Sequence, residues 1–244
     1  MRNVDQPAFL LSAARNLAVA GQMGLDMMVL CKCGFGTLKA AQYMLARDEA
    51  SRREVDRRLR EQGLKYDARV SVRHFLSVLY HDVGLDALKE RISHPLKGLN
   101  VAAHVGCHAL RPSHITEFDD PVAPRIFDEL VKVTGAKSLD WDTRLDCCGA
   151  PLLGVNDELS LDLTRAKLQR ALEAGADTLA TACPYCQLQF ETALSRKAAG
   201  DGDFPAVPPE LYAVLLAAAM GIETRVTLPG AGEGAEKVVA AASA

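Results

Sequence analysis

The fold is decided by the stretch from Cys107 to Cys186, which contains Gly106-Cys107, Asp146-Cys147-Cys148-Gly149 and Cys183-Pro-Tyr-Cys186. Short apolar segments precede these cysteines at 101–105, 138–141 and 178–181, and patterns typical of amphipathic helices lie between them. Strand–helix repeats of this length predict a parallel sheet with right-handed crossovers. Because the loops that follow parallel strands gather at one edge of the sheet, the five thiols are expected to meet there.

The first half of the chain repeats part of this pattern. An apolar segment at 27–30 leads into Cys31-Lys-Cys33-Gly-Phe-Gly36, which we expect to form a tight, glycine-bearing loop before a helix at 38–47. Gly-x-Asp turns precede both this segment and the one at 178–181. The two regions are typical of two copies of one unit, with the first copy lacking its upstream part. The predicted fold class is therefore α/β, with two similar Rossmann-like parallel-sheet units, the first incomplete.

The expected domains follow from turns and charge patterns. Pro95-Leu-Lys-Gly98 is a turn and the best boundary, so residues 1–97 form the incomplete unit and 98–229 the complete one. A charged helix at 51–62, opened by a Ser51…Glu54 capping box, is inserted in the first unit, and its mixed charges favour a solvated helix with internal ion pairs. The Ala/Gly-rich residues 230–244 are expected to be a frayed tail.

Composition excludes several classes of function. The chain has 244 residues, 49% of them hydrophobic, and a net charge of −3. It is long enough for one large or two small domains, and its charge does not favour nucleic acid or an anionic membrane as a partner. No segment has the roughly 18 consecutive apolar residues of a membrane span. Seven cysteines without a convincing secretory signal predict reduced thiols and a cytoplasmic protein.

The cysteine pattern favours an iron–sulfur cluster over other uses of thiols. Cys183 and Cys186 alone would also suit a redox pair or a zinc site. The vicinal pair Cys147-Cys148 argues against both, because five thiols exceed the four ligands of tetrahedral zinc. Zinc binding and purely structural thiols remain as alternatives. Gly149 is expected to let the backbone approach the cluster, whose sulfides need N–H donors.

Two other groups of residues carry weaker signals. For Cys31 and Cys33, a second metal site and two partly buried thiols are equally favoured. His104, His108 and His114 flank Cys107. Hydrogen bonds around that loop are the favoured role for them, and a histidine ligand to the metal is the alternative.

The cysteine spacing and the words around it resemble a known family. Cys107, Cys147-Cys148-Gly149, Cys183 and Cys186 resemble the cysteine-rich CCG domain, and the surrounding sequence resembles the B subunit of heterodisulfide reductase. The segments that carry this resemblance are CKCGFGTLK at 31–39, VRHFLSVLYHDVG at 72–84, VGCHALRPS at 105–113, DCCGAPLLGVNDELSLDLTRAKL at 146–168 and ACPYCQLQFE at 182–191.

The resemblance implies a function and a set of ligands. Family members carry two CCG motifs, and each motif holds a noncubane [4Fe–4S] cluster. The pair of clusters cleaves or forms a disulfide between two thiol cofactors. Their partners are a ferredoxin-like iron–sulfur subunit and a flavoprotein subunit. By this resemblance Cys107, Cys147, Cys148, Cys183 and Cys186 bind one cluster and act through it, while a second cluster depends on an N-terminal motif that is incomplete here.

The departure from the family pattern leaves alternatives open. Cys31 matches the first cysteine of the closing C-x-x-C element, but the second falls on Gly34, and Cys33 lies one position early. Either an N-terminal segment is missing from the sequence or the first cluster has been lost. The chain is thus expected to be a catalytic subunit acting on a small thiol or disulfide, with an electron-relay or binding subunit and a zinc-stabilised scaffold as the alternatives.

Overall fold

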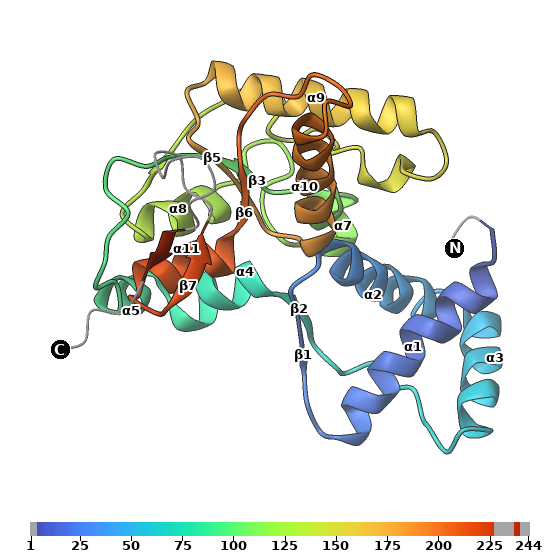
Figure 1. The fold of residues 1–244 in the computed structure, drawn as a ribbon. Helices are drawn as coiled ribbons and strands as arrows, with labels where there is room; N and C mark the ends of the chain where they lie inside the picture. Colours follow the sequence, from blue (N-terminus) through green and yellow to red (C-terminus); the bar gives the residue numbers. More distant parts are fainter. Residues whose placement is uncertain (1–3, 227–236, 240–244) are drawn as a thin grey trace. The chain divides into compact units, whose positions relative to one another are not determined.

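The computed structural model describes residues 4–226 and 237–239 (Figure 1). The chain forms two compact units. Unit 1 combines the residues up to Phe75 with the later segment His108–Phe118, and unit 2 combines Leu76–Cys107 with the residues from Asp119 onward. The boundary that the sequence predicts, between residues 97 and 98, separates two copies of a repeated sequence unit rather than two compact units. It stays a prediction.

The elements of unit 1 are few. They are the helices α1 (Gln6–Gln22), α2 (Lys32–Leu45), α3 (Glu49–Arg60) and α7 (Ser113–Thr116) and the strands β1 (Met27–Val29) and β2 (Val72–His74).

The elements of unit 2 alternate along the chain. The strands are β3 (Asn100–His104), β4 (Lys137–Ser138), β5 (Thr178–Thr181), β6 (Pro209–Leu211), β7 (Thr224–Val226) and β8 (Lys237–Val239). The helices are α5 (Leu85–Glu90), α8 (Ile126–Val133), α9 (Asp157–Glu173), α10 (Pro184–Ala198) and α11 (Tyr212–Ala219), with a 3-10 turn, η2, at Ala150–Leu152. Two short elements cross the boundary between the units, α4 (Phe75–Ser77), continued by the π-helical turn η1 (Val78–Val83), and α6 (Cys107–Leu110).

A four-stranded parallel sheet organises unit 2, in the order β4-β3-β5-β6. Its two central strands are buried on both faces, as expected of parallel strands covered by helices. Val101, Ala102, Leu179 and Ala180 are all fully buried. This sheet and the smaller parallel sheet of unit 1 confirm the predicted α/β class; β7 and β8 form a separate antiparallel pair.

The direction of each crossover decides which face of this sheet a helix covers. The connection from β3 to β4 runs one way along the sheet, and those from β4 to β5 and from β5 to β6 run the other way. Right-handed crossovers then place α9 and α10 together on one face and α8 on the other. The contacts agree, since α9 packs on α10 and the ring of Phe127 in α8 meets Tyr212 of α11 edge-on at 5.5 Å. Figure 1 shows the α9–α10 layer separate from α8 and α11.

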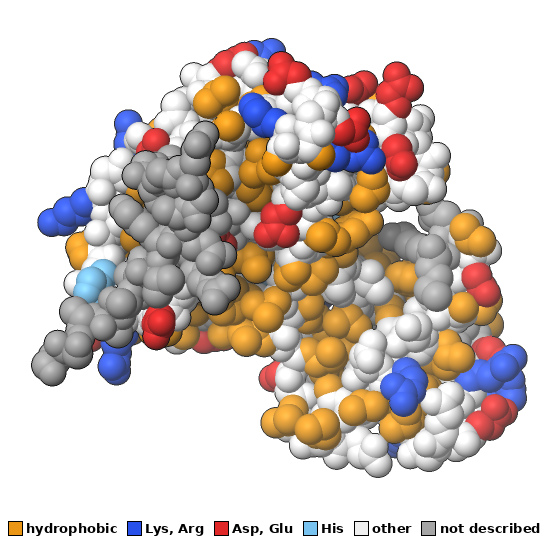
Figure 2. All heavy atoms as spheres, viewed as in Figure 1, with side chains coloured by type: hydrophobic (Ala, Val, Ile, Leu, Met, Phe, Trp, Pro, Cys, Tyr) orange, Lys and Arg blue, Asp and Glu red, His pale blue; other side chains and the backbone are white. Residues whose placement is uncertain are grey.

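Unit 1 is a two-stranded parallel sheet, with Met27 opposite Val72, covered by helices. Helix α1 packs against α2 and α3 through buried Leu10, Ala14 and Leu17. Hydrophobic side chains appear on the face of unit 1 in Figure 2, and the exposed large ones near β1 are Met23, Leu25, Met28 and Leu30.

The charged helix of unit 1 is as solvated as its composition predicts. On α3, Arg57 pairs with Glu54 at 2.7 Å and with Glu61 at 2.5 Å, and Arg58 pairs with Glu54 at 2.9 Å. The expected capping box is wrong, however. Asp48 caps the helix by accepting hydrogen bonds from the N–H groups of Ala50 and Ser51, because α3 begins two residues earlier than predicted.

The predicted loop at Cys31–Gly36 is also wrong. Helix α2 begins at Lys32 with Cys31 as its N-cap, so both glycines of this segment are helical. Gly36 is required by close packing, since a Cβ there would lie 2.8 Å from the carbonyl oxygen of His108. The expected frayed tail at 230–244 lies outside the described residues, apart from 237–239 in β8.

Candidate metal centre

Two loops at the carboxyl edge of the unit 2 sheet carry cysteines directly after a strand. β3 ends at His104, and Gly106, with φ of 86°, turns the chain so that Cys107 opens α6. β5 ends at Thr181, and the extended residue Cys183 is the N-cap of α10. The pair Cys147-Cys148 follows β4 at the end of a longer loop and precedes η2.

The structure brings together one histidine and two cysteines: His104 at the end of β3, Cys148 before η2 and Cys186 in the first turn of α10. One ligand atom each from His104, Cys148 and Cys186 lies within 4.8 Å of the others, and the two sulfur atoms are 2.9 Å apart. This separation is too long for a disulfide bond of about 2.05 Å. All seven cysteines of the chain lie in its described part, and none is joined in a disulfide. Since all three residues are at most 1% exposed, this is a dry group of soft donors.

The other three predicted ligands stand on the same loops. Cys147 adjoins Cys148, Cys183 lies in the turn that opens the helix of Cys186, and Cys107 follows His104 by three residues. Cys183 is buried, whereas Cys107 and Cys147 are half-buried. The predicted set of five ligands therefore stays a prediction, while its members Cys148 and Cys186 are in contact.

His104 lies beside two of the thiols. One of its ring nitrogens is within 4.8 Å of the Cys148 and Cys186 sulfur atoms, and the ring meets Phe190 of α10 edge-on at 5.4 Å. The expected hydrogen bonds around the Cys107 loop stay a prediction, and so does the alternative of a histidine ligand. The sequence does carry a signal that His104 lies near the thiols: it is the last residue of a buried strand, directly before the first cysteine loop.

Gly149 has the conformation and the contacts that a cluster loop needs. Its φ is 91°, and a Cβ would lie 2.2 Å from the carbonyl oxygen of Ser160, so a side chain at this position is excluded. Its N–H group donates a hydrogen bond to the Cys147 sulfur at 3.4 Å. The backbone thus approaches sulfur closely at this residue.

The comparisons with known proteins agree with this centre. The cysteine-rich domain CCG matches residues 101–191. The B subunit of the ferredoxin:CoB-CoM heterodisulfide reductase of Methanosarcina mazei is 35% identical over 226 residues, which cover 90% of this chain and 74% of that protein. The chain belongs to the family of heterodisulfide reductase B subunits. A protein of Archaeoglobus profundus that is described as similar to this B subunit is 34% identical over 80% of this chain and 67% of its own length.

A solved structure shares the fold of this member of the heterodisulfide reductase family. It is the crystal structure of a hypothetical protein from Helicobacter pylori, with a TM-score of 0.68 and 16% identity. The match covers 91% of this chain and 40% of the other chain. Its low identity limits the comparison to the fold.

A buried polar network holds the Cys148–Gly149 backbone in this family member. The hydroxyl of Thr164 donates to the Cys148 carbonyl at 2.8 Å, and that of Ser160 donates to the Gly149 carbonyl at 3.0 Å. The Gln189 amide of α10 donates to both hydroxyls, at 2.8 and 3.0 Å. No pattern in the sequence indicates this network, because Ser, Thr and Gln in amphipathic helices are mostly exposed.

Unit 1 contains a second group of sulfur and nitrogen donors. The sulfur atoms of Cys31 and Cys33 lie within 4.8 Å of each other, and that of Cys33 is 3.3 Å from Nδ1 of His108. Gly36, one turn along α2 from Cys33, admits the His108 backbone at this point. The Cys31–Cys33 site stays a prediction, and His108 is an additional candidate ligand.

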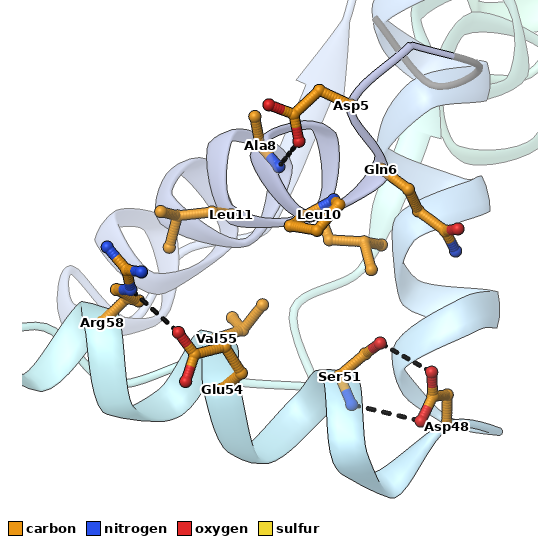
Figure 3. Close-up of a pocket in the computed structure, with 11 residues that line it drawn as sticks. Asp5, Gln6, Ala8, Leu10, Leu11, Asp48, Ser51, Glu54, Val55 and Arg58 are labelled. Carbon is orange, nitrogen blue, oxygen red and sulfur yellow. Dashed lines mark hydrogen bonds and ion pairs between the residues drawn. The ribbon is translucent and has the colours of Figure 1, made fainter.

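A pocket of about 420 Å³ in unit 1 contains no cysteine (Figure 3). It lies between the first turns of α1 and α3. Its acidic groups already have partners, since Asp5 accepts from the Ala8 N–H, Asp48 from Ser51, and Glu54 from Arg58. We therefore assign no chemistry to this pocket.

The donor set of unit 2 fits an iron–sulfur cluster. Thiolates hold such clusters, and nearby N–H groups and dry surroundings tune them. The close unbridged thiols, the N–H of Gly149 and the burial of the centre meet these needs. Together with family membership, they support an iron–sulfur redox subunit of a multi-subunit reductase. No helix within the described residues is long and apolar enough to span a bilayer.

Proposed function

We propose that this chain is the catalytic iron–sulfur subunit of a heterodisulfide-reductase-like complex. It cleaves or forms a disulfide at a noncubane [4Fe–4S] cluster bound by Cys107, Cys147, Cys148, Cys183 and Cys186. The observation that supports this most directly is the meeting of Cys148 and Cys186, 2.9 Å apart, unbridged and buried beside His104.

The reaction needs electrons, protons and an exclusion of water. Reduction of a disulfide breaks one S–S bond, takes up two electrons and two protons, and forms two S–H groups. When bound, the cluster supplies electrons. The chain's own residues hold the cysteine loops in place through Gly149, Ser160 and Thr164, and their burial keeps water away from the thiols.

The expected partners follow from the family. A ferredoxin-like iron–sulfur subunit would deliver or accept electrons, a flavoprotein subunit would exchange them with it, and a small thiol or disulfide would be the substrate. The relatives' names mention ferredoxin and the CoB–CoM heterodisulfide, which makes a small-molecule disulfide the first substrate to test. The cytoplasmic location inferred from the cysteines also stays a prediction.

A second candidate function is electron relay without bond cleavage. It is favoured because one cysteine-rich domain is matched, at residues 101–191, while the motif around Cys31 is incomplete. Among the described residues of unit 1, the cysteines are Cys31 and Cys33, and we propose them as a smaller metal site. Turnover of a small disulfide with a reduced viologen dye separates catalysis from relay.

Substitution of either cysteine of the Cys148–Cys186 contact tests whether the centre binds a cluster. Chains with Cys148→Ser or Cys186→Ser should lose most of the approximately four iron and four acid-labile sulfide per chain that the unsubstituted protein binds, together with its electron paramagnetic resonance signal. The matched control is Thr192→Ala on the exposed side of α10, which should retain both. Full iron and an unchanged signal in both cysteine variants would remove these residues from the ligand set, and zinc in place of iron would favour the scaffold alternative.

A further inference from the structure

Lys167 of α9 is buried in a position where a charge is costly. It is 1% exposed and ranks among the largest fully buried side chains of unit 2. An ammonium group removed from water must be compensated by fixed polar partners. The groups that it contacts therefore indicate what the charge does.

Lys167 is hydrogen-bonded to the loop that leads to the vicinal cysteines. The ammonium group donates to the carbonyl of Thr143 and, at 3.0 Å, to that of Asp146, and it lies 5.0 Å from the centre of the Trp141 ring. The N–H of Asp146 closes the same turn by donating to the Thr143 carbonyl at 2.9 Å. Lys167 thus clamps a tight turn that ends next to Cys147.

The clamped turn contains a strained residue. Thr143 has φ of 62°, in the left-handed region, which a β-branched residue rarely adopts. Such a conformation persists only where the surroundings fix it, and it is concentrated at functional sites. Two hydrogen bonds to the Thr143 carbonyl provide that restraint here.

The charge is also placed to act on the centre. The Asp146 carbonyl belongs to the same peptide group as the amide nitrogen of Cys147, so the ammonium is bonded to the peptide that precedes the first cysteine of the pair. Reduction adds negative charge to a cluster, and a buried positive charge nearby stabilises the reduced form.

We propose that Lys167 is a positioning residue for the metal centre, which fixes the Cys147-Cys148 loop and whose positive charge raises the reduction potential of the cluster. This inference rests on the proposed function, because it requires an iron–sulfur cluster at these cysteines.

The test compares Lys167→Met with Lys167→Arg in the full chain loaded with its cluster. Methionine fills a similar volume without charge, whereas arginine keeps the charge. An anaerobic redox titration followed by electron paramagnetic resonance should show a more negative midpoint potential for Lys167→Met. We expect the equilibrium constant for one-electron reduction to fall about tenfold in Lys167→Met, which corresponds to a shift of about 59 mV in the midpoint potential. The shift in Lys167→Arg should be smaller. The control is Arg170→Met, which removes an exposed charge from the same helix and should leave the potential unchanged.

The possible outcomes separate this inference from the proposed function. Absence of iron from the unsubstituted chain defeats the proposed function and this inference with it. Normal iron content with an unchanged potential in Lys167→Met overturns the inference alone. If Lys167→Met binds no iron, amide hydrogen exchange of residues 143–149 in the metal-free chains decides: faster exchange than in Lys167→Arg supports the clamp, and equal exchange overturns it.

Discussion

At the scale of single residues, two constraints meet at Gly149. Its left-handed backbone disfavours any L side chain, and the Ser160 carbonyl occupies the space of a Cβ. The same residue donates an N–H to sulfur. A substitution here therefore disturbs the fold and the centre at a single position.

Alanine at this position gives a direct prediction. Gly149→Ala should destabilise the metal-free chain by about 1–3 kcal/mol, the usual cost of a strained backbone, with the clash adding to it. It should also lower the bound iron, because the loop must move away from Ser160. Urea unfolding of the metal-free chain and iron analysis of the loaded chain measure the two effects.

The neighbouring Gly154 supplies the control for that prediction. It has φ of 81°, but a Cβ there would meet nothing within 4 Å. Gly154→Ala should therefore lose some stability through backbone strain while keeping its iron. Equal iron loss in both variants would mean that general destabilisation, rather than the Gly149 contact, empties the centre.

At the scale of elements, α3 provides a pH-dependent test of its ion pairs. Hydrogen bonds from Arg57 and then Arg58 lower the pKa of Glu54 from 4.5 to about 2. Because the folded pKa is depressed, the stabilisation is complete above pH 4.5 and is lost as the pH falls towards 2.

The expected result is a pH-dependent difference between two proteins. Glu54→Gln should be less stable than the unsubstituted chain at pH 6, and the difference should shrink steadily between pH 4.5 and 2, as measured by urea unfolding. Added salt should reduce it as well, since all three side chains are exposed. A difference that is constant over this range would show that helix propensity, not the ion pairs, causes it. The comparison variant is Glu49→Gln, which removes a single, longer ion pair to Arg53 at 3.6 Å and should show a smaller difference.

Among the helices and strands, some could be predicted from the sequence and others could not. The strands around Val101 and Leu179 were predictable because short apolar runs followed by helical patterns have few other structures. The first turn of α2 was not, because Gly34 and Gly36 are typical of loops, and the reason for Gly36 is a tertiary contact with His108. Strand β6 is short and begins with a proline, so no periodicity marks it.

The candidate centre was predictable in part for a similar reason. Thiols after successive parallel strands meet by topology alone, so the gathering of Cys148 and Cys186 follows from the order of elements. The supporting residues Gln189 and Lys167 were not predictable, because a polar side chain on a helix gives no sign of burial until the facing helix is known.

At the scale of the whole molecule, all five predicted ligands belong to unit 2, on loops that join its strands to its helices. A bound metal centre links those loops, so its binding energy adds to the folding energy of that unit. Unit 1 contains β1 and β2, and none of these five cysteines. Removal of iron is therefore expected to affect the two units differently.

Chelation under anaerobic conditions tests this expectation. If the centre contributes at least about 2.7 kcal/mol, as a ligand at 100 times its Kd would, the unfolding temperature of unit 2 should fall by roughly 5–10 °C. Amide hydrogen exchange should become faster at the carboxyl ends of β3 and β5 and stay unchanged in β1 and β2. In Cys186→Ser, which lacks a ligand, chelation should have no further effect. A uniform loss of protection over both units would instead mean that the metal stabilises the chain as one cooperative body, and the assignment of the centre to unit 2 alone would fail.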